Sequence, residues 1–145
     1  MRAKVGHFVV VSALAFWLGG LTFYAGIVVP IANRLLGSDQ QGLVTQQVTN
    51  YLNAIGVAAL VLLFGNGMLV RSRALMLVAG ILTLAQAALF VIHQQLDRLL
   101  EARSAGFDHS YFYAVHERYL IVVTIQWLTG LAALWYVLST RKSSQ

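Results

Sequence analysis

"YLNAIGVAALVLLFGNGMLVRSRALMLVAGILTLAQAALFVI", residues 51–92, contains two charge-free apolar runs, 51–70 and 74–92, separated only by the tripeptide RSR. Each run is close to the roughly 20 residues that an α-helix needs to cross the hydrocarbon core of a bilayer. A connection of three residues leaves room only for a tight turn. The stretch therefore predicts two transmembrane helices that are antiparallel neighbours.

Two more charge-free runs, residues 8–31 and 119–138, flank this hairpin. The whole chain has 145 residues, of which 59% are hydrophobic and 10% charged, and its mean hydropathy is +0.72. In soluble domains about a quarter of the residues are charged, so the lower charged fraction of this chain indicates that lipid is its solvent. The run 8–31 is longer than the apolar part of a signal peptide, so we expect it to be retained. The sequence predicts one integral membrane domain, 1–145, folded as an all-α bundle of four transmembrane helices.

The charged residues separate onto the two sides of this four-pass arrangement. Six of the ten basic residues fall on one side: Arg2, Lys4, Arg71, Arg73, Arg141 and Lys142. All five acidic residues fall on the other side: Asp39, Asp97, Glu101, Asp108 and Glu117. By the positive-inside rule, both termini are predicted to be cytoplasmic, in a bacterial cytoplasmic membrane. The net charge of +5 is thus explained by topology, and we expect no nucleic-acid partner.

The first predicted helix carries small residues on one face: Ala15, Gly19, Thr22 and Gly26. Such a face permits close helix approach, so it predicts packing inside the bundle, with a cofactor against the smooth face as the alternative. Pro30 is expected to end this helix or to kink its last turn.

Polar residues follow in the segment 32–50 and recur inside the membrane. The serine and glutamine of "SDQQ", residues 38–41, fit a capping box, so the second helix is predicted to begin near Asp39 with solvated first turns. The glutamines and threonines within the spans predict interhelical hydrogen bonds: Thr83, Gln86, Thr124, Gln126 and Thr129. Tyrosines near the same membrane boundary, Tyr51, Tyr111, Tyr113 and Tyr119, are expected to be interfacial anchors.

"HQQLDRLLEARSAGFDHSYFYAVHERY", residues 93–119, holds three of the four histidines and four of the five carboxylates. Apolar periodicity continues from both sides, so the third and fourth helices are predicted to extend into an outer helical hairpin that turns near Ala105. Equal rise on both arms would place His93 level with His116, and Gln86 close to Gln126. The polar stripes expected to face one seam are Gln86, Phe90, His93, Asp97 and Glu101 on one arm, and His109, Tyr113, His116, Leu120, Val123 and Trp127 on the other.

Three interpretations of this hairpin remain open. His93 and His116 could bind a cofactor, such as a haem iron held axially, or a divalent metal could be held by some of His93, Asp97, His109, His116 and Glu117. Histidine beside carboxylate and tyrosine is also typical of a proton-handling or quinol-type site. Alternatively, these groups could simply staple a solvated hairpin. Thiolate ligands are excluded because the chain has no cysteine.

Two stretches carry a family resemblance: "GGLTFYAGIVVPIANRLLG", residues 19–37, and "FYAVHERYLIVVTIQWLTG", residues 112–130. In its glycine-rich first helix that ends in proline, and in its phenylalanine and histidine before the last helix, the chain resembles the bacterial relatives of the transmembrane-protein-205-like domain family. An asparagine expected in the last helix is replaced here by residues such as Thr124 and Gln126. The resemblance implies a small four-helix membrane protein and no particular activity.

From these features we expect a non-enzymatic integral membrane protein, either an accessory subunit or a small membrane component. Its partners would be the lipid bilayer and either another membrane protein or further copies of itself. The alternative is a membrane redox protein that binds haem or a metal through histidine and carboxylate side chains at the outer membrane boundary.

Overall fold

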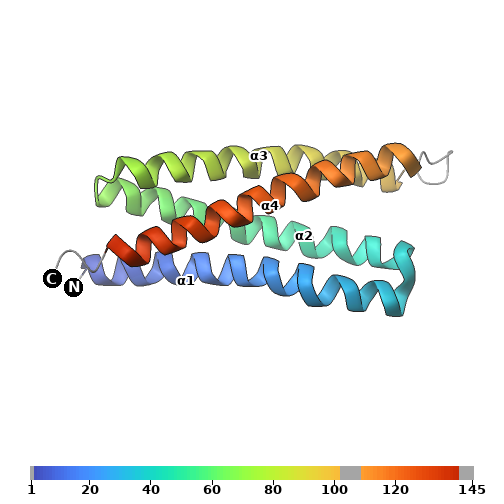
Figure 1. Cartoon of the computed structure of the whole chain (residues 1–145), viewed down its shortest axis with the longest axis horizontal. Helices are drawn as coiled ribbons and strands as arrows, with labels where there is room; N and C mark the ends of the chain where they lie inside the picture. Colours follow the sequence, from blue (N-terminus) through green and yellow to red (C-terminus); the bar gives the residue numbers. More distant parts are fainter. Residues whose placement is uncertain (1, 102–108, 141–145) are drawn as a thin grey trace.

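The computed structural model describes residues 2–101 and 109–140, without the side chains of residues 2–4, 38, 39, 101, 109 and 140. Its elements are α1 (Arg2–Phe23), the π-helix η1 (Tyr24–Val28), α2 (Val29–Leu69), α3 (Arg73–Glu101) and α4 (His109–Thr140). The predicted all-α four-helix bundle is confirmed, with long third and fourth helices (Figure 1). The turn predicted near Ala105 lies outside the described residues.

Four helical stretches within the described part of the chain are long and apolar enough to cross a membrane: Val5–Gly37, Gln40–Leu69, Arg73–Leu100 and Ser110–Ser139. Each is longer than the charge-free run that predicted it. Many of their large apolar side chains point outward, with Leu84 73% and Phe16 69% exposed. Exposed hydrocarbon on this scale suits contact with lipid, so the chain is a multi-pass integral membrane protein.

The predicted tight turn after residue 70 is confirmed, and its hydrogen bonds explain how it stops one helix and starts the next. The backbone N–H of Ser72 donates to Gly67 O at 3.0 Å and that of Arg71 to Met68 O at 3.2 Å, the pattern of a Schellman motif. Arg71 is left-handed, with φ 52°, at the position where glycine is commonest. Ser72 Oγ then accepts the N–H of Leu75 at 3.3 Å and caps α3.

Pro30 does not end the first span. The helix passes through Pro30 and turns only at Gly37, whose φ of 74° and ψ of 168° interrupt the α2 segment. The preceding turn is the π-helix η1, which widens the backbone just where the proline ring would crowd the carbonyl one turn earlier. Glycine takes a positive φ at little cost, so Gly37 makes the reversal. The second transmembrane helix follows it, close to the predicted start near Asp39.

The small-residue stripe, which runs from α1 into η1, is not buried inside the bundle, so the prediction that it packs there is wrong, although its Thr22 meets α4 through Trp127. Ala15, Gly19, Thr22 and Gly26 are all exposed, and a Cβ added at Gly19 or Gly26 would meet nothing within 4 Å. The buried face instead carries large side chains, namely Val10, Leu14, Trp17 and Leu18. Close approach to this face is made possible by glycines of other helices: a Cβ on Gly130 would lie 2.7 Å from Leu18.

The apolar core fills the half of the bundle nearest the Arg71 turn. That turn lies at the same end as the start of α1 and the end of α4 (Figure 1). Buried core residues include Leu14, Leu63, Leu82, Ala133 and Val137. Buried polar residues, in contrast, lie further along the bundle: Thr49, Asn53, Gln86, His93 and Gln126. The interior therefore changes from apolar to partly polar along its length.

Candidate functional site

Three amides from three helices meet at the edge of the apolar core. Gln86 Nε2 donates to Asn53 Oδ1 at 3.0 Å, and Gln126 Nε2 donates to Gln86 Oε1 at 3.0 Å. Gln126 Nε2 also lies 3.4 Å from Leu82 O. All three side chains are buried, with residue exposures of 5% or less. We call Asn53, Gln86 and Gln126 the amide layer; it joins α2, α3 and α4, and it satisfies most of its own polar atoms.

Gly56 lets α1 reach the amide layer. A Cβ at this position would lie 2.7 Å from Trp17 Nε1 and 2.9 Å from Gln86 Oε1, closer than real Cβ contacts allow. Trp17 itself is 1% exposed. The indole of α1 and the amide of α3 thus fill the space that a side chain at residue 56 would otherwise take.

His93 lies two helical turns from Gln86 along α3 and is 7% exposed. Its Nε2 lies 3.7 Å from Oδ2 of Asp97, one turn further along the same helix. Neither Nε2 of His93 nor Oδ1 of Asp97 has a hydrogen-bond partner. Such groups are normally satisfied when buried, so this site can accept a proton, a water molecule or a ligand atom.

Tyr119 brings α4 to His93, with the two ring centroids 6.2 Å apart. The Tyr119 hydroxyl lies beside the side chain of Thr49, and the Tyr24 hydroxyl beside that of Thr45. Tyr119, predicted as an interfacial anchor, is therefore half-buried inside the bundle. Thr49, predicted to be solvated, is 6% exposed. We call His93, Asp97, Tyr119 and Thr49 the histidine site.

The pairing of α3 with α4 differs from the expected one by three residues. His93 meets Tyr119, not His116, and this pairing agrees with that of Gln86 and Gln126. His116 lies one turn earlier in α4, half-buried, with its ring stacked on that of Phe112 at a centroid distance of 6.1 Å. Tyr113 and Leu120, expected in the seam, are 63% and 49% exposed, and the buried positions of α4 in the seam are Val115 and Gln126.

The remaining predicted ligands do not gather around His93. Glu117 is exposed, and His109 begins α4 with its side chain outside the described part. Within the residues that the structure describes, no group of three or more histidine, aspartate or glutamate side chains could hold a metal ion. His93 and Asp97 are the predicted ligands that the structure brings together.

Comparison with models of known protein families shows which family the chain belongs to. A family model described as a domain of unknown function, DUF4149, matches residues 12–105, well over half of the chain. The chain belongs to the DUF4149 family. Searches against curated proteins and solved structures gave no match. The DUF4149 match includes Asn53, Gln86 and His93, whereas Gln126 and Tyr119 lie beyond it in α4. The description of the DUF4149 family assigns no activity, so the arrangement of the side chains is the basis for any functional proposal.

Three threonines of this DUF4149 chain do not make the predicted interhelical bonds. Thr83, Thr124 and Thr129 each donate to the carbonyl four residues earlier in their own helix. A different threonine, Thr22, joins two helices by accepting Trp127 Nε1 at 2.9 Å.

Asn53, at one end of the amide layer, was not among the residues predicted from the sequence. A usable pattern was present, since Asn53 shares a helix face with Gly56, Leu60 and Leu63, at steps of three and four residues. A polar residue on the buried face of a transmembrane helix is expected to form a hydrogen bond to a neighbouring helix.

Proposed function

We propose that this chain is a non-enzymatic membrane component, either an accessory subunit or a small membrane protein, and that it takes up a proton at His93. The observation that carries the proposal is the buried imidazole of His93, whose Nε2 has no hydrogen-bond partner. Ionisable side chains inside a transmembrane bundle are costly, and they commonly mark proton relays or ligand sites.

Protonation would satisfy Nε2 of His93, which now lacks a hydrogen-bond partner. A doubly protonated imidazole donates from both nitrogens, and an ionised carboxylate only accepts. A small side-chain movement would shorten the 3.7 Å between His93 Nε2 and Asp97 Oδ2 to the roughly 2.7–2.9 Å of a charge-assisted hydrogen bond. The new bond would span one turn of α3 and face Tyr119 on α4.

Nitrogen NMR of histidine-labelled protein in lipid nanodiscs, recorded over a series of pH values, tests this proposal. The His93 signal, assigned with H93Q, should include a doubly protonated form. D97N should reduce that form, because it removes the carboxylate that would accept a hydrogen bond from the imidazolium. A His93 signal that is never doubly protonated, or that is the same in D97N, would refute proton uptake at this site.

The haem or metal alternative uses the same atom, since Nε2 of His93 is a standard ligand nitrogen. Binding through His93 and His116 stays a prediction. Protein purified from its own membrane should then show a Soret band, or stoichiometric iron or zinc, that disappears in both H93A and H116A. If the preparation is colourless and free of metal but still shows a doubly protonated His93, proton uptake is the function that remains.

We also infer that the chain is a single domain with both termini cytoplasmic, in a bacterial cytoplasmic membrane. Arg71 and Arg73 in the α2–α3 turn support this orientation. The likeness to the relatives of the transmembrane-protein-205-like domain family is kept as a proposal beside the DUF4149 membership. The subunit role predicts co-purification with a stable partner from native membranes, and a consistently lone, monodisperse protein would contradict that role.

A further inference from the structure

Three buried side-chain atoms of the described residues have no hydrogen-bond partner: Nδ2 of Asn53, Nε2 of His93 and Oδ1 of Asp97. They belong to two helices, α2 and α3, that pack against each other. We call the part of the bundle between the amide layer and the end opposite the Arg71 turn the polar half, and the rest the apolar half. All three atoms lie at the amide layer or in the polar half, so the unsatisfied groups are confined to one side of the interior.

These atoms follow one another along the bundle. Asn53 is level with Gln86, to which it is hydrogen-bonded. At 1.5 Å per residue of α3, His93 lies about 10.5 Å beyond Gln86, and Asp97 about 16.5 Å beyond it. The side chain of Asp97 is 24% exposed, whereas that of His93 is 8% exposed. The row therefore begins at a carboxylate that solvent reaches and ends at the amide layer.

Hydroxyl groups lie in the interval between Asn53 and His93. Thr49 is buried one turn before Asn53 on α2, toward the open end of the polar half. Its side chain lies beside the hydroxyl of Tyr119, whose ring centroid is 6.2 Å from that of His93. Tyr24 of η1 interacts electrostatically with Tyr119, so all four spans contribute polar groups to this level. Hydroxyls both donate and accept, so they can hold water between Asn53 and His93.

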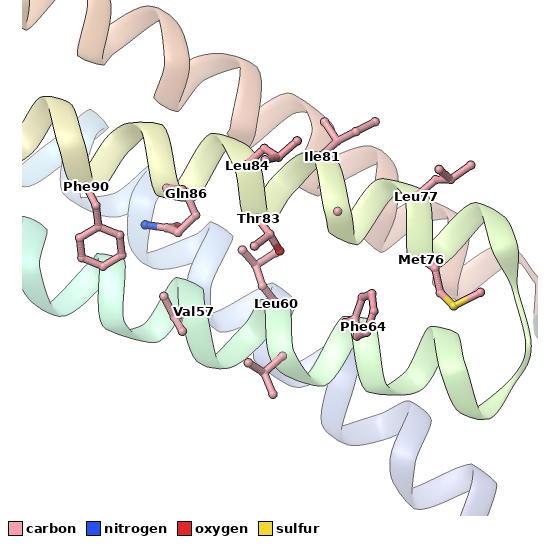
Figure 2. A pocket seen from close by; sticks show the side chains of 13 residues that line it. Val57, Leu60, Phe64, Met76, Leu77, Ile81, Thr83, Leu84, Gln86 and Phe90 are labelled. Carbon is pink, nitrogen blue, oxygen red and sulfur yellow. The ribbon is translucent and has the colours of Figure 1, made fainter.

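The apolar half offers water no such partners. Among the described residues, no buried polar or charged side chain lies between the amide layer and the Arg71 turn. Each of the four helices contributes buried hydrocarbon there, for example Leu14, Leu63, Leu82 and Val137. The α2–α3 groove, most of which runs along this half, is lined by apolar side chains except for Thr83 and Gln86 (Figure 2). Interiors lined by hydrocarbon stay dry, so water has no continuous path to the Arg71 turn.

We propose that water enters the polar half from its open end and stops at the amide layer, where Asn53 Nδ2 donates a hydrogen bond to the innermost water molecule. A buried water molecule commonly makes about three hydrogen bonds to otherwise unsatisfied polar groups, which suits this row of atoms. The titratable groups around His93 are Asp97 on its own helix and Tyr119 on α4.

The consequence for protons rests on the uptake proposed at His93. An acid in the entering water gives its proton to Nε2 of the neutral imidazole, and the conjugate base stays in the water. The proton leaves by the same route, because the apolar half holds no group that could pass it on. His93 therefore exchanges protons with one side of the membrane only, and the chain does not conduct them across.

Single cysteines test the entry of water, since the chain has none of its own. T49C lies in the polar half, and A59C is its matched control on the same helix, because Ala59 is 1% exposed within the apolar core. Ag⁺ is the probe: thiolates bind soft cations, and an ion does not enter hydrocarbon. Free thiol that remains after exposure of lipid vesicles to Ag⁺ is counted with a maleimide in denaturing detergent. T49C should react with Ag⁺ at least tenfold faster than A59C.

The side of entry is measured against S72C in the α2–α3 turn. In right-side-out and inverted vesicles, Ag⁺ should reach T49C only from the side opposite to that which labels S72C. Three results would overturn the proposal: T49C that is unreactive from both sides, T49C that reacts from the side of S72C, or A59C that reacts as fast as T49C.

Water-edited solid-state NMR of the unsubstituted protein in bilayers gives a second test if T49C does not fold. Magnetisation from water should reach the side-chain amide of Asn53, assigned with N53S, before it reaches the methyl groups of Leu63 and Leu82. Equal transfer times would overturn the entry of water as far as the amide layer. Neither measurement involves protonation, so a failure of water entry is distinguishable from a failure of proton uptake, which the histidine spectra report.

Discussion

Gly56 is the residue at which α1, α2 and α3 approach one another most tightly. A methyl group at this position would lie 2.7 Å from the indole nitrogen of Trp17, a contact that cannot form without movement. Elsewhere in a helix, alanine is more favourable than glycine by about 0.5–1 kcal/mol. We expect G56A to destabilise the protein by about 1–3 kcal/mol, because overpacking outweighs the gain in helix propensity.

Gly65 is the matched control for this prediction, since a Cβ there meets nothing within 4 Å. Reversible unfolding in mixed micelles should show G65A at least as stable as the parent protein and G56A less stable. Equal stability of the two variants would mean that Trp17 does not lie against Gly56.

Gln86 links both other members of the amide layer, donating to Asn53 and accepting from Gln126. Q86L would leave the buried Asn53 Oδ1 without its donor and Gln126 Nε2 with only Leu82 O at 3.4 Å, which costs about 1–3 kcal/mol. T83V is the control, because Thr83 is exposed and bonds only to Ala79 O of its own helix. The same unfolding measurement should place T83V within about 0.5 kcal/mol of the parent. A Q86L protein as stable as T83V would contradict the amide layer.

At the scale of an element, the α2–α3 turn depends on a left-handed residue. Arg71 has φ 52°, and a non-glycine residue pays roughly 1–2 kcal/mol for this conformation. R71G should therefore raise the melting temperature, although glycine's greater freedom in the unfolded chain offsets part of the gain. R73G, at the first residue of α3, should lower it. Melting temperatures that change in the opposite order would show that the turn has another conformation.

The relative position of α3 and α4 marks the limit of what the sequence could predict for elements. The four membrane-crossing helices, the RSR turn and the proximity of Gln86 to Gln126 followed from apolar runs and equal rise. The three-residue difference that gives His93 the partner Tyr119 could not be predicted, because the length of the segment between the two helices does not fix how it turns. One helical residue corresponds to about 100° of rotation, so a small error in depth also changes which side chains face the seam.

At the scale of the whole molecule, the four-pass arrangement makes a prediction about sidedness. The chain has no cysteine, so single cysteines at Ser72, Ser139 and Glu117 would each report alone. The α2–α3 turn, which holds Ser72, lies at the same end of the bundle as the end of α4, which holds Ser139, whereas the start of α4, which holds Glu117, lies at the other end (Figure 1). A membrane-impermeant thiol reagent should label S72C and S139C from the same side and E117C from the opposite side. Labelling of S72C and E117C from one side would exclude four crossings.

Composition and apolar periodicity were sufficient for the class of fold, because a chain in lipid has few ways to satisfy its backbone other than helices. Composition and periodicity were insufficient to predict which side chains are buried inside the bundle. The stripe of Ala15, Gly19, Thr22 and Gly26 predicted tight packing, yet the structure buries Leu14, Trp17 and Leu18 instead. Small residues allow close approach without requiring it, and which face is buried depends on all four helices together. His93 and Asp97 were predictable as a pair because they are one turn apart in the same helix.

Polar side chains of α3 and α4 meet inside a four-helix membrane bundle. Solid-state NMR of protein in bilayers, with histidine, tyrosine and glutamine labelled, can observe this meeting. We expect a contact between the rings of His93 and Tyr119, lost in Y119F labelled in the same way, and a second between the side chains of Gln86 and Gln126. Absence of both contacts, or a His93 ring that meets only water, would contradict it.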